Sequence, residues 1–265
     1  MSVVRVGIAR GVMTVTLADV ANRNALGAEL VQGLGDALER ANADAGVRVV
    51  VITNEGNTFC AGANLKEQSG ARPVSGAART AIARGGVDGV LGAIMRSPTP
   101  VVGKIAGHVV GGGNGLAAAL DIAIAADDVK FGFTEVRLGV IPAIISVVCL
   151  PKMRRGEAME AFLRGNRFPA ARAAELGLIS RAVPRAQLDA AVDEVVEDLR
   201  QGGPNALGLA KRLVYDVPAM PAAEAFAYTT KLSAELFRGA EAAEGMRAFL
   251  EKRPAAWSKT GASEE

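Results

Sequence analysis

The chain has 265 residues, of which 50% are hydrophobic and only 4% aromatic, and its 30 basic residues nearly balance 28 acidic ones. This length is enough for one large domain with a substantial core. The net charge of +2 offers no basic surface for nucleic acid or anionic membranes, so we expect neither as a partner. The first residues show no signal-peptide pattern, and two cysteines are too few for a disulfide framework. A cytoplasmic protein is expected.

The first part of the chain alternates between strand-like and helix-like segments. Leu30, Leu34 and Leu38 recur at helical spacing, whereas the run that ends at Gly56 is β-branched, as in a buried parallel strand. This alternation favours an α/β fold. The expected elements are a hairpin within residues 3–18, a helix at 26–44, single strands at 47–56 and 99–110, and a pair of strands within 121–133.

From about Asp189 onward the pattern is helical only. We therefore predict a core over residues 1–200 that holds the active site, and a helical region over 201–265 for oligomerisation and for covering the site. The expected C-terminal helices are 188–201, 204–216, 222–237 and 243–253. Residues 66–75 are expected to form a mobile surface segment, and the tail 258–265 is expected to be disordered.

Several kinds of chemistry are excluded by residue type. One histidine and two cysteines leave almost no ligands for a zinc site, so no metal is expected. Neither a G-x-S-x-G elbow nor a Walker A motif occurs. Residues 113–118 match the dinucleotide pattern G-x-G-x-x-A, but a single match in mid-chain is weak support for it. We interpret His108 as a hydrogen-bonded structural residue.

Two glycine-rich turns each follow a predicted strand. One contains Gly111, Gly112, Gly113 and Gly115, and the other is Ala61–Gly62–Ala63. A turn that leads into a helix N-terminus presents free N–H groups, which suit a carboxylate, a phosphate or a developing oxyanion. The alternative is that both turns are merely tight connections.

Four stretches of the sequence resemble motifs of a known family, and this resemblance favours the interpretation that the two turns bind an anion or an oxyanion. They are NRNALG at 22–27, GNTFCAGANLKE at 56–67, the long stretch GHVVGGGNGL…GVIP at 107–142, and RGNRFPAARAAELGLISRAVP at 164–184. In these motifs the chain resembles the crotonase superfamily of enoyl-CoA hydratases and isomerases. The resemblance implies an α/β crotonase (ClpP-like) spiral of repeated ββα units with a helical C-terminal oligomerisation region. It also implies a homotrimer or a dimer of trimers.

The same resemblance implies an acyl-CoA substrate, a role in fatty acid metabolism, and no separate cofactor. The N–H groups of Ala63 and Gly112 would form the oxyanion hole for the thioester carbonyl. Acyl specificity would be set within the loop 66–89. The residues implied in substrate and CoA binding are Arg23, Ala25, Leu26, Ala61, Asn64, Leu65, Gly111 and Gly115, with Phe249 and Lys252 contributed in part by a neighbouring subunit.

The carboxylates expected of a hydratase are incomplete. Family hydratases carry two glutamates; the first, in a G-G-G-C-E-L pattern, is replaced here by Gly115, and the second matches Glu135. The apolar surroundings of Glu135 are expected to raise its pKa and suit it to proton transfer. A single acid/base favours 3,2-enoyl-CoA isomerisation, whereas the resemblance to a bacterial subgroup that keeps this glycine favours enoyl-CoA hydration. Hydration, isomerisation and non-catalytic acyl-CoA binding therefore remain as alternatives, in that order.

Three other polar residues lie near these motifs. The Asn114 side chain is expected to point away from the position that the missing glutamate would take. Asp121 is interpreted as a buried structural hydrogen-bonding group. If its segment is extended, Arg137 would share the face of Glu135 and could pair with a carboxylate on the acyl group.

Overall fold

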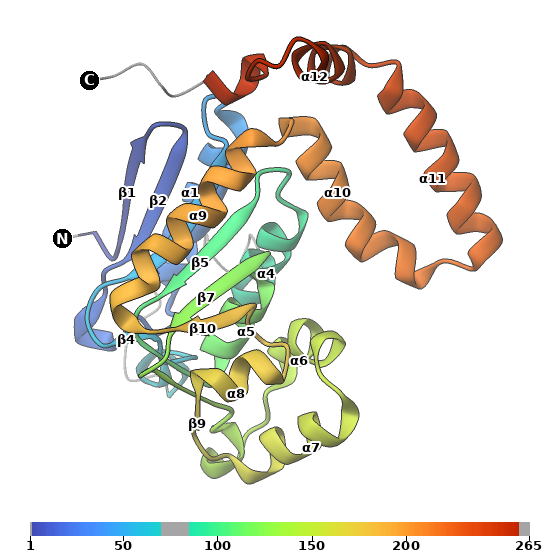
Figure 1. The fold of residues 1–265 in the computed structure, drawn as a ribbon. Helices are drawn as coiled ribbons and strands as arrows, with labels where there is room; N and C mark the ends of the chain where they lie inside the picture. The colour runs from blue at the N-terminus through green and yellow to red at the C-terminus, as the bar shows by residue number, and fades with distance from the viewer. Residues whose placement is uncertain (1, 70–84, 260–265) are drawn as a thin grey trace.

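The computed structural model describes residues 2–69 and 85–259, which form two sheets, surrounding helices and a helical C-terminal arm (Figure 1). Parts of the expected mobile segment, of the expected specificity loop and of the expected tail lie outside the described residues. None of the helices within the described ranges is long and apolar enough to cross a membrane.

The larger sheet contains six strands in the order β1-β2-β3-β5-β7-β10. They are β1 (Val4–Ala9), β2 (Val12–Leu17), β3 (Val49–Asn54), β5 (Val101–Ile105), β7 (Ile122–Ala126) and β10 (Arg181–Val183). Strands β1 and β2 form the predicted antiparallel hairpin, and the other neighbours are parallel. Val49, Val50 and Ile52 of β3 are fully buried, which confirms the central strand that the β-branched run predicted.

The smaller sheet has the order β4-β6-β8-β9. Its strands are β4 (Thr58–Cys60), β6 (His108–Val110), β8 (Lys130–Gly132) and β9 (Phe168–Pro169). The single strand expected at 99–110 is therefore wrong, because the chain leaves the larger sheet after Ile105 and joins the smaller one at His108. Gly107 permits this crossing, since a Cβ there would stand 2.6 Å from the backbone nitrogens of Thr58 and Phe59.

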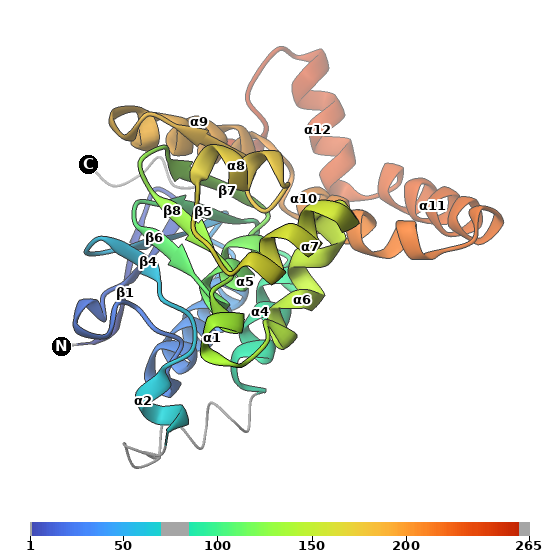
Figure 2. The ribbon, with the colours of Figure 1, turned by 90° about the horizontal axis from the view of Figure 1, so that it is seen from below.

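Helices cover both faces of the larger sheet. In Figure 2 the strands lie between α9 on one side and α1, α4 and α5 on the other. The helices of this core are α1 (Ala28–Ala43), α2 (Leu65–Gln68), α4 (Gly86–Arg96), α5 (Gly112–Ala119), α6 (Ala143–Cys149), α7 (Arg155–Arg164), α8 (Ala170–Glu175) and α9 (Leu188–Gln201). Short 3-10 helices are η1 (Val20–Asn22), η2 (Glu135–Leu138), η3 (Leu150–Lys152), η4 (Arg185–Gln187), η5 (Val217–Ala219) and η6 (Ala256–Lys259).

The C-terminal arm consists of α10 (Pro204–Asp216), α11 (Ala222–Phe237) and α12 (Ala240–Leu250). The predicted bounds of the first two helices are confirmed, whereas α12 begins and ends three residues before its predicted bounds. Both views show the arm projecting from the sheets (Figures 1 and 2). No residue of α11, which is described over its whole length, is buried.

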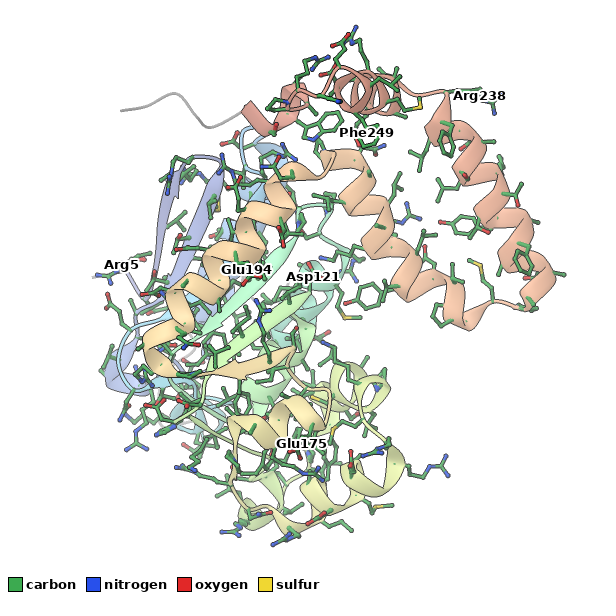
Figure 3. The ribbon with its side chains drawn as sticks, viewed as in Figure 1. Arg5, Asp121, Glu175, Glu194, Arg238 and Phe249 are labelled. Carbon is green, nitrogen blue, oxygen red and sulfur yellow. The ribbon has the colours of Figure 1, made fainter. Side chains whose placement is uncertain are left out.

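A nearly buried ion pair fastens the arm to the core. Lys211 Nζ of α10 lies 2.8 Å from Asp121 Oδ2, and it also donates to the Ile94 carbonyl at 2.7 Å. The same Asp121 oxygen accepts the Val101 N–H at 2.7 Å. Burial raises the pKa of Asp121 and lowers that of Lys211, and the attraction within the pair opposes both shifts. Asp121, which faces α10 in Figure 3, is thus the buried structural group that was predicted.

Candidate active site

The two glycine-rich turns meet at the N-terminus of α5. A Cβ on Gly62 would stand 2.7 Å from the Gly112 nitrogen, and a Cβ on Gly113 would stand 2.4 Å from the Cys60 carbonyl oxygen. Gly62 and Gly111 also have φ values of 85° and 56°, which side-chain-bearing residues rarely adopt. The glycines are therefore needed because the two turns of the protein itself approach each other closely.

The predicted donors lie side by side in these turns. A Cβ on Gly112 would stand 3.5 Å from the Ala63 nitrogen. Within the described part of the chain, neither the Ala63 N–H nor the Gly112 N–H donates a hydrogen bond. The carbonyl oxygen of each of these two peptide groups accepts a hydrogen bond. Leu26 N–H donates to the Gly62 carbonyl at 2.7 Å, and Asn114 N–H donates to the Gly111 carbonyl at 2.9 Å. The pair can therefore bind one external oxygen between them.

Glu135, the first residue of η2, places its carboxylate beside these donors. A Cβ on Gly111 would stand 3.5 Å from Glu135 Oε1 and 3.8 Å from the Gly62 Cα. The other carboxylate oxygen, Oε2, is buried and has no hydrogen-bond partner among the described residues. Burial raises the pKa of Glu135 above its usual range. A carboxylate in this state is suited to accept and return a proton.

The inner face of α6 forms an apolar wall near Glu135. Ile145, Val148 and Cys149 are all buried on this face. Burial raises the pKa of the Cys149 thiol to about 12; the Lys152 ammonium opposes that rise, and the Glu135 carboxylate adds to it. Cys149 is therefore a neutral thiol, and this wall offers Glu135 no charged partner.

The space that a side chain at position 115 would need is already occupied. Gly115 lies three residues after Gly112, so it follows the second glycine-rich turn by nearly one turn of α5. A Cβ on Gly115 would stand 2.2 Å from Ile145 Cγ2 and 2.6 Å from Ile145 Cβ. The space beside position 115, where the resemblance would place the first glutamate, is therefore filled by the Ile145 side chain of α6. Gly115 itself, predicted to contact substrate, is buried beneath Ile145.

The residues predicted to line the CoA path gather around one backbone contact. Leu26 forms a parallel bridge with Ala63, and Ala61 N–H donates to the Arg23 carbonyl at 3.1 Å. Ala25 and Leu26 are buried, whereas Arg23 and Leu65 are exposed.

Asn64 is buried and has a structural task in the same region. Its Nδ2 donates to Glu67 Oε1 at 2.8 Å, and its Oδ1 accepts the Lys66 N–H at 3.2 Å, which caps α2. Glu67 Oε2 in turn accepts the N–H of Ala28 at the start of α1. Its carbonyl also accepts the Glu67 N–H at 3.1 Å, so Asn64 joins α2 to α1 through its side chain and holds the first turn of α2 through its backbone.

The remaining predicted contacts, Phe249 and Lys252, are not brought to the site by this single chain. Phe249 lies on α12 with 82% of its surface exposed, and Lys252 follows that helix with a left-handed φ of 54°. In Figure 2, α12, which carries Phe249 and precedes Lys252, lies apart from α5.

Arg137 and His108 each make a structural contact away from the two glycine-rich turns. The segment after Thr134 is a 3-10 helix and is not extended, so Arg137 does not share the face of Glu135; it reaches the Arg164 carbonyl at 3.5 Å. The expected pairing of Arg137 with a carboxylate on the acyl group required an extended segment, and this segment is not extended. His108 Nδ1 accepts the Lys130 N–H at 3.0 Å, which ties β6 to the start of β8, as expected of a structural histidine. No group of metal-ligating side chains occurs within the described ranges.

The model of the enoyl-CoA hydratase/isomerase family matches residues 7–260. The chain belongs to this family. It is 30% identical over 242 residues to the enoyl-CoA hydratase EchA19 of Mycobacterium tuberculosis, covering 91% of each chain. Among solved structures, an enoyl-CoA hydratase of Mycobacterium smegmatis superposes with a TM-score of 0.87 at 30% identity, covering 97% of this chain and 99% of the other. An enoyl-CoA hydratase/isomerase of Marinobacter aquaeolei gives 0.87 at 27% identity, with 97% and 100% covered.

The fold of this hydratase/isomerase family member is therefore the predicted α/β crotonase fold, with two mixed sheets and a C-terminal helical region. Sequence reasoning missed Ile145 and Cys149 as parts of the site. Their only signal was the apolar run AIISVVC, in which these two residues are four apart and so share one face of a helix.

Proposed function

We propose that this protein is an acyl-CoA enzyme in which Glu135 moves a proton while Ala63 and Gly112 hold the thioester oxygen. The observation that carries the proposal is the unpaired, buried Oε2 of Glu135 beside two free N–H groups. The Glu135 carboxylate takes a proton from C2 of the acyl group. The electron pair of that C–H bond moves onto the carbonyl oxygen, and the two N–H groups stabilise the resulting enolate.

Double-bond isomerisation is the reaction that this arrangement supports best. In a 3-enoyl thioester, Glu135 would remove a proton from C2 and return it to C4, so that the double bond moves from C3–C4 to C2–C3. One carboxylate is enough for both transfers. Hydration calls for a second polar group to activate water at C3, and Ile145 occupies the space beside Gly115 where that group would stand. Hydration is the second candidate because relatives such as EchA19 are named enoyl-CoA hydratases.

The absorbance of the conjugated enoyl thioester distinguishes these reactions. With a 3-enoyl-CoA, we expect absorbance to rise in the presence of the protein. With the corresponding 2-enoyl-CoA, we expect no loss beyond the amount set by the isomerisation equilibrium. A full loss from the 2-enoyl ester, with the 3-hydroxyacyl product found by mass spectrometry, would establish hydration instead. Tight binding of both esters without any change would leave a non-catalytic acyl-CoA binding protein.

We also propose that residues 1–200 form the catalytic core and that residues 201–265 assemble a homotrimer or a dimer of trimers. Large apolar side chains are exposed on the arm of the isolated chain: Phe226, Phe237, Phe249 and Leu250. Exposed apolar side chains of this size on α11 and α12 favour burial against another copy of the protein. In that assembly, Phe249 and Lys252 would reach the CoA of a neighbouring subunit.

Light scattering tests the assembly. We expect a mass of three or six chains for the wild-type protein and a smaller mass for Phe226→Asp, because a charge in the centre of a buried apolar contact is costly. Glu194→Gln, which removes a charge from the exposed side of α9, serves as the control and should leave the mass unchanged. A wild-type monomer at assay concentration would contradict the proposal.

A further inference from the structure

Asn114, the third residue of α5, has its side chain folded back on the turn that precedes the helix. It is 1% exposed, and its Nδ2 donates to the carbonyl oxygens of Gly111 and Gly132, both at 2.9 Å. Its own backbone N–H also donates to the Gly111 carbonyl at 2.9 Å. The Gly111 oxygen therefore receives two hydrogen bonds, both from Asn114.

The Gly111 carbonyl and the Gly112 N–H are two ends of one planar peptide group. Donors placed on the carbonyl oxygen fix the plane of that group, and they also polarise it so that its N–H becomes a stronger donor. Gly111 N–H meanwhile donates to the Gly132 carbonyl at 2.9 Å, the same oxygen that Asn114 contacts. Asn114 thus links the turn at Gly111 to the end of strand β8.

We propose that Asn114 is a positioning residue of the oxyanion hole, which fixes and polarises the peptide that carries the Gly112 N–H. The other half of the hole is held differently, because the Gly62 carbonyl accepts a backbone N–H from Leu26. Only the Gly112 donor is thus under the control of a side chain that a substitution can remove.

The side-chain oxygen of Asn114, Oδ1, argues against a purely space-filling role for this residue. Asn114 Oδ1 is buried without a hydrogen-bond partner among the described residues. A buried acceptor in that state lowers stability, which an apolar residue of similar size would avoid. The two bonds donated by Nδ2 are therefore the feature that favours asparagine at this position.

This inference rests on the proposed function, and the experiment separates the two. The probe is butanoyl-CoA labelled with ¹³C at the thioester carbonyl, a saturated ester that the protein cannot hydrate or isomerise. Binding in an oxyanion hole draws electron density to the oxygen and moves the carbonyl resonance downfield. We expect a downfield shift with the wild-type protein and a smaller one with Asn114→Ala. The kcat for 3-enoyl-CoA should fall by about tenfold, less than when a hole donor is lost entirely, with little change in KM.

Ser97→Ala is the control. Ser97 is also buried, and its hydroxyl lies 2.8 Å from Asn42 Oδ1 and 2.7 Å from the Thr99 carbonyl oxygen. These partners belong to neither turn of the hole, so this variant should lose stability without altering the carbonyl shift. If Asn114→Ala does not fold, Asn114→Cys fills similar space with a weak donor and should show the same reduced shift.

Three results would decide the matter. A smaller shift in the Asn114 variants alone supports the positioning role. A wild-type shift and a wild-type kcat in a less stable Asn114 variant would overturn it, because the residue would then act on stability only. Absence of any downfield shift with the wild-type protein would overturn the proposed function itself, and this inference with it.

Discussion

Replacing Glu135 by glutamine is expected to lower kcat for 3-enoyl-CoA isomerisation by about 10²–10⁴-fold, the usual contribution of a general acid/base. Glutamine keeps the size of the side chain but cannot accept the proton from C2. The affinity for butanoyl-CoA, measured by titration calorimetry, should stay within a few-fold of wild type. Glu194→Gln, on the exposed face of α9 (Figure 3), is the control and should leave kcat unchanged. An unchanged kcat in Glu135→Gln would remove Glu135 from the mechanism.

The pH dependence of the same reaction follows from the raised pKa of Glu135. Because burial favours the protonated acid, kcat/KM should fall as the pH drops through a value above the ordinary glutamate pKa. The contribution of Glu135 to the stability of the fold changes with pH in the opposite direction to its contribution to activity. The folded protein binds this proton more tightly than the unfolded chain, so the contribution of Glu135 to stability decreases as the pH rises through the two pKa values. Glu135→Gln should therefore unfold at a higher temperature than the wild type at neutral pH, while being less active.

Introducing the missing carboxylate alone, as Gly115→Glu, is expected to destabilise the protein strongly. The new Cβ would overlap Ile145, and overpacking of this kind costs about 1–3 kcal/mol even before the carboxylate is buried. Truncation of the isoleucine, Ile145→Ala, should cost about 2–5 kcal/mol by itself because it leaves a cavity. The double variant should be more stable than the sum of the two losses predicts, with a coupling free energy of about 0.5–3 kcal/mol.

Urea unfolding of the four proteins measures this coupling directly. Additive losses would mean that residues 115 and 145 do not compete for the same space. An activity measurement on the same variants tests the role of Ile145. Loss of 2-enoyl-CoA absorbance should appear in the double variant and not in either single variant. Only the double variant has both a carboxylate and room for water. Hydration of similar rate in the wild type would contradict the role assigned to Ile145.

Much of the fold could be predicted because its elements are specified locally. The β-branched run of β3 and the leucine spacing of α1 identify those elements regardless of their neighbours. The helices α10 and α11 begin at residues 204 and 222, as their patterns predicted. The two glycine turns also met as expected, because each follows a strand of the same small sheet.

The errors came from features that depend on contacts between distant segments. The strand expected at 99–110 divides at Gly107 because the chain must pass against the backbone at Thr58, which lies about fifty residues earlier. Ile145 carries no sign in its own sequence that it fills the space beside Gly115; only the packing of α6 on α5 places it there. The condition set for Arg137, an extended segment, is not met because residues 135–138 form a 3-10 helix, where alternate residues no longer point the same way.

The free N–H groups of Ala63 and Gly112 belong to the main chain, which has a consequence for how such a protein can change over generations. Every amino acid except proline supplies an N–H, so most substitutions of Ala63 itself keep its donor, whereas Gly62, Gly111 and Gly113 cannot take a side chain without moving the turns. In the proposed mechanism the reaction depends, by contrast, on the Glu135 side chain and on the residues at positions 115 and 145, each of which a single codon can alter. New activities can therefore arise here by exchanging a few side chains around an inherited binding element that is built from main-chain groups.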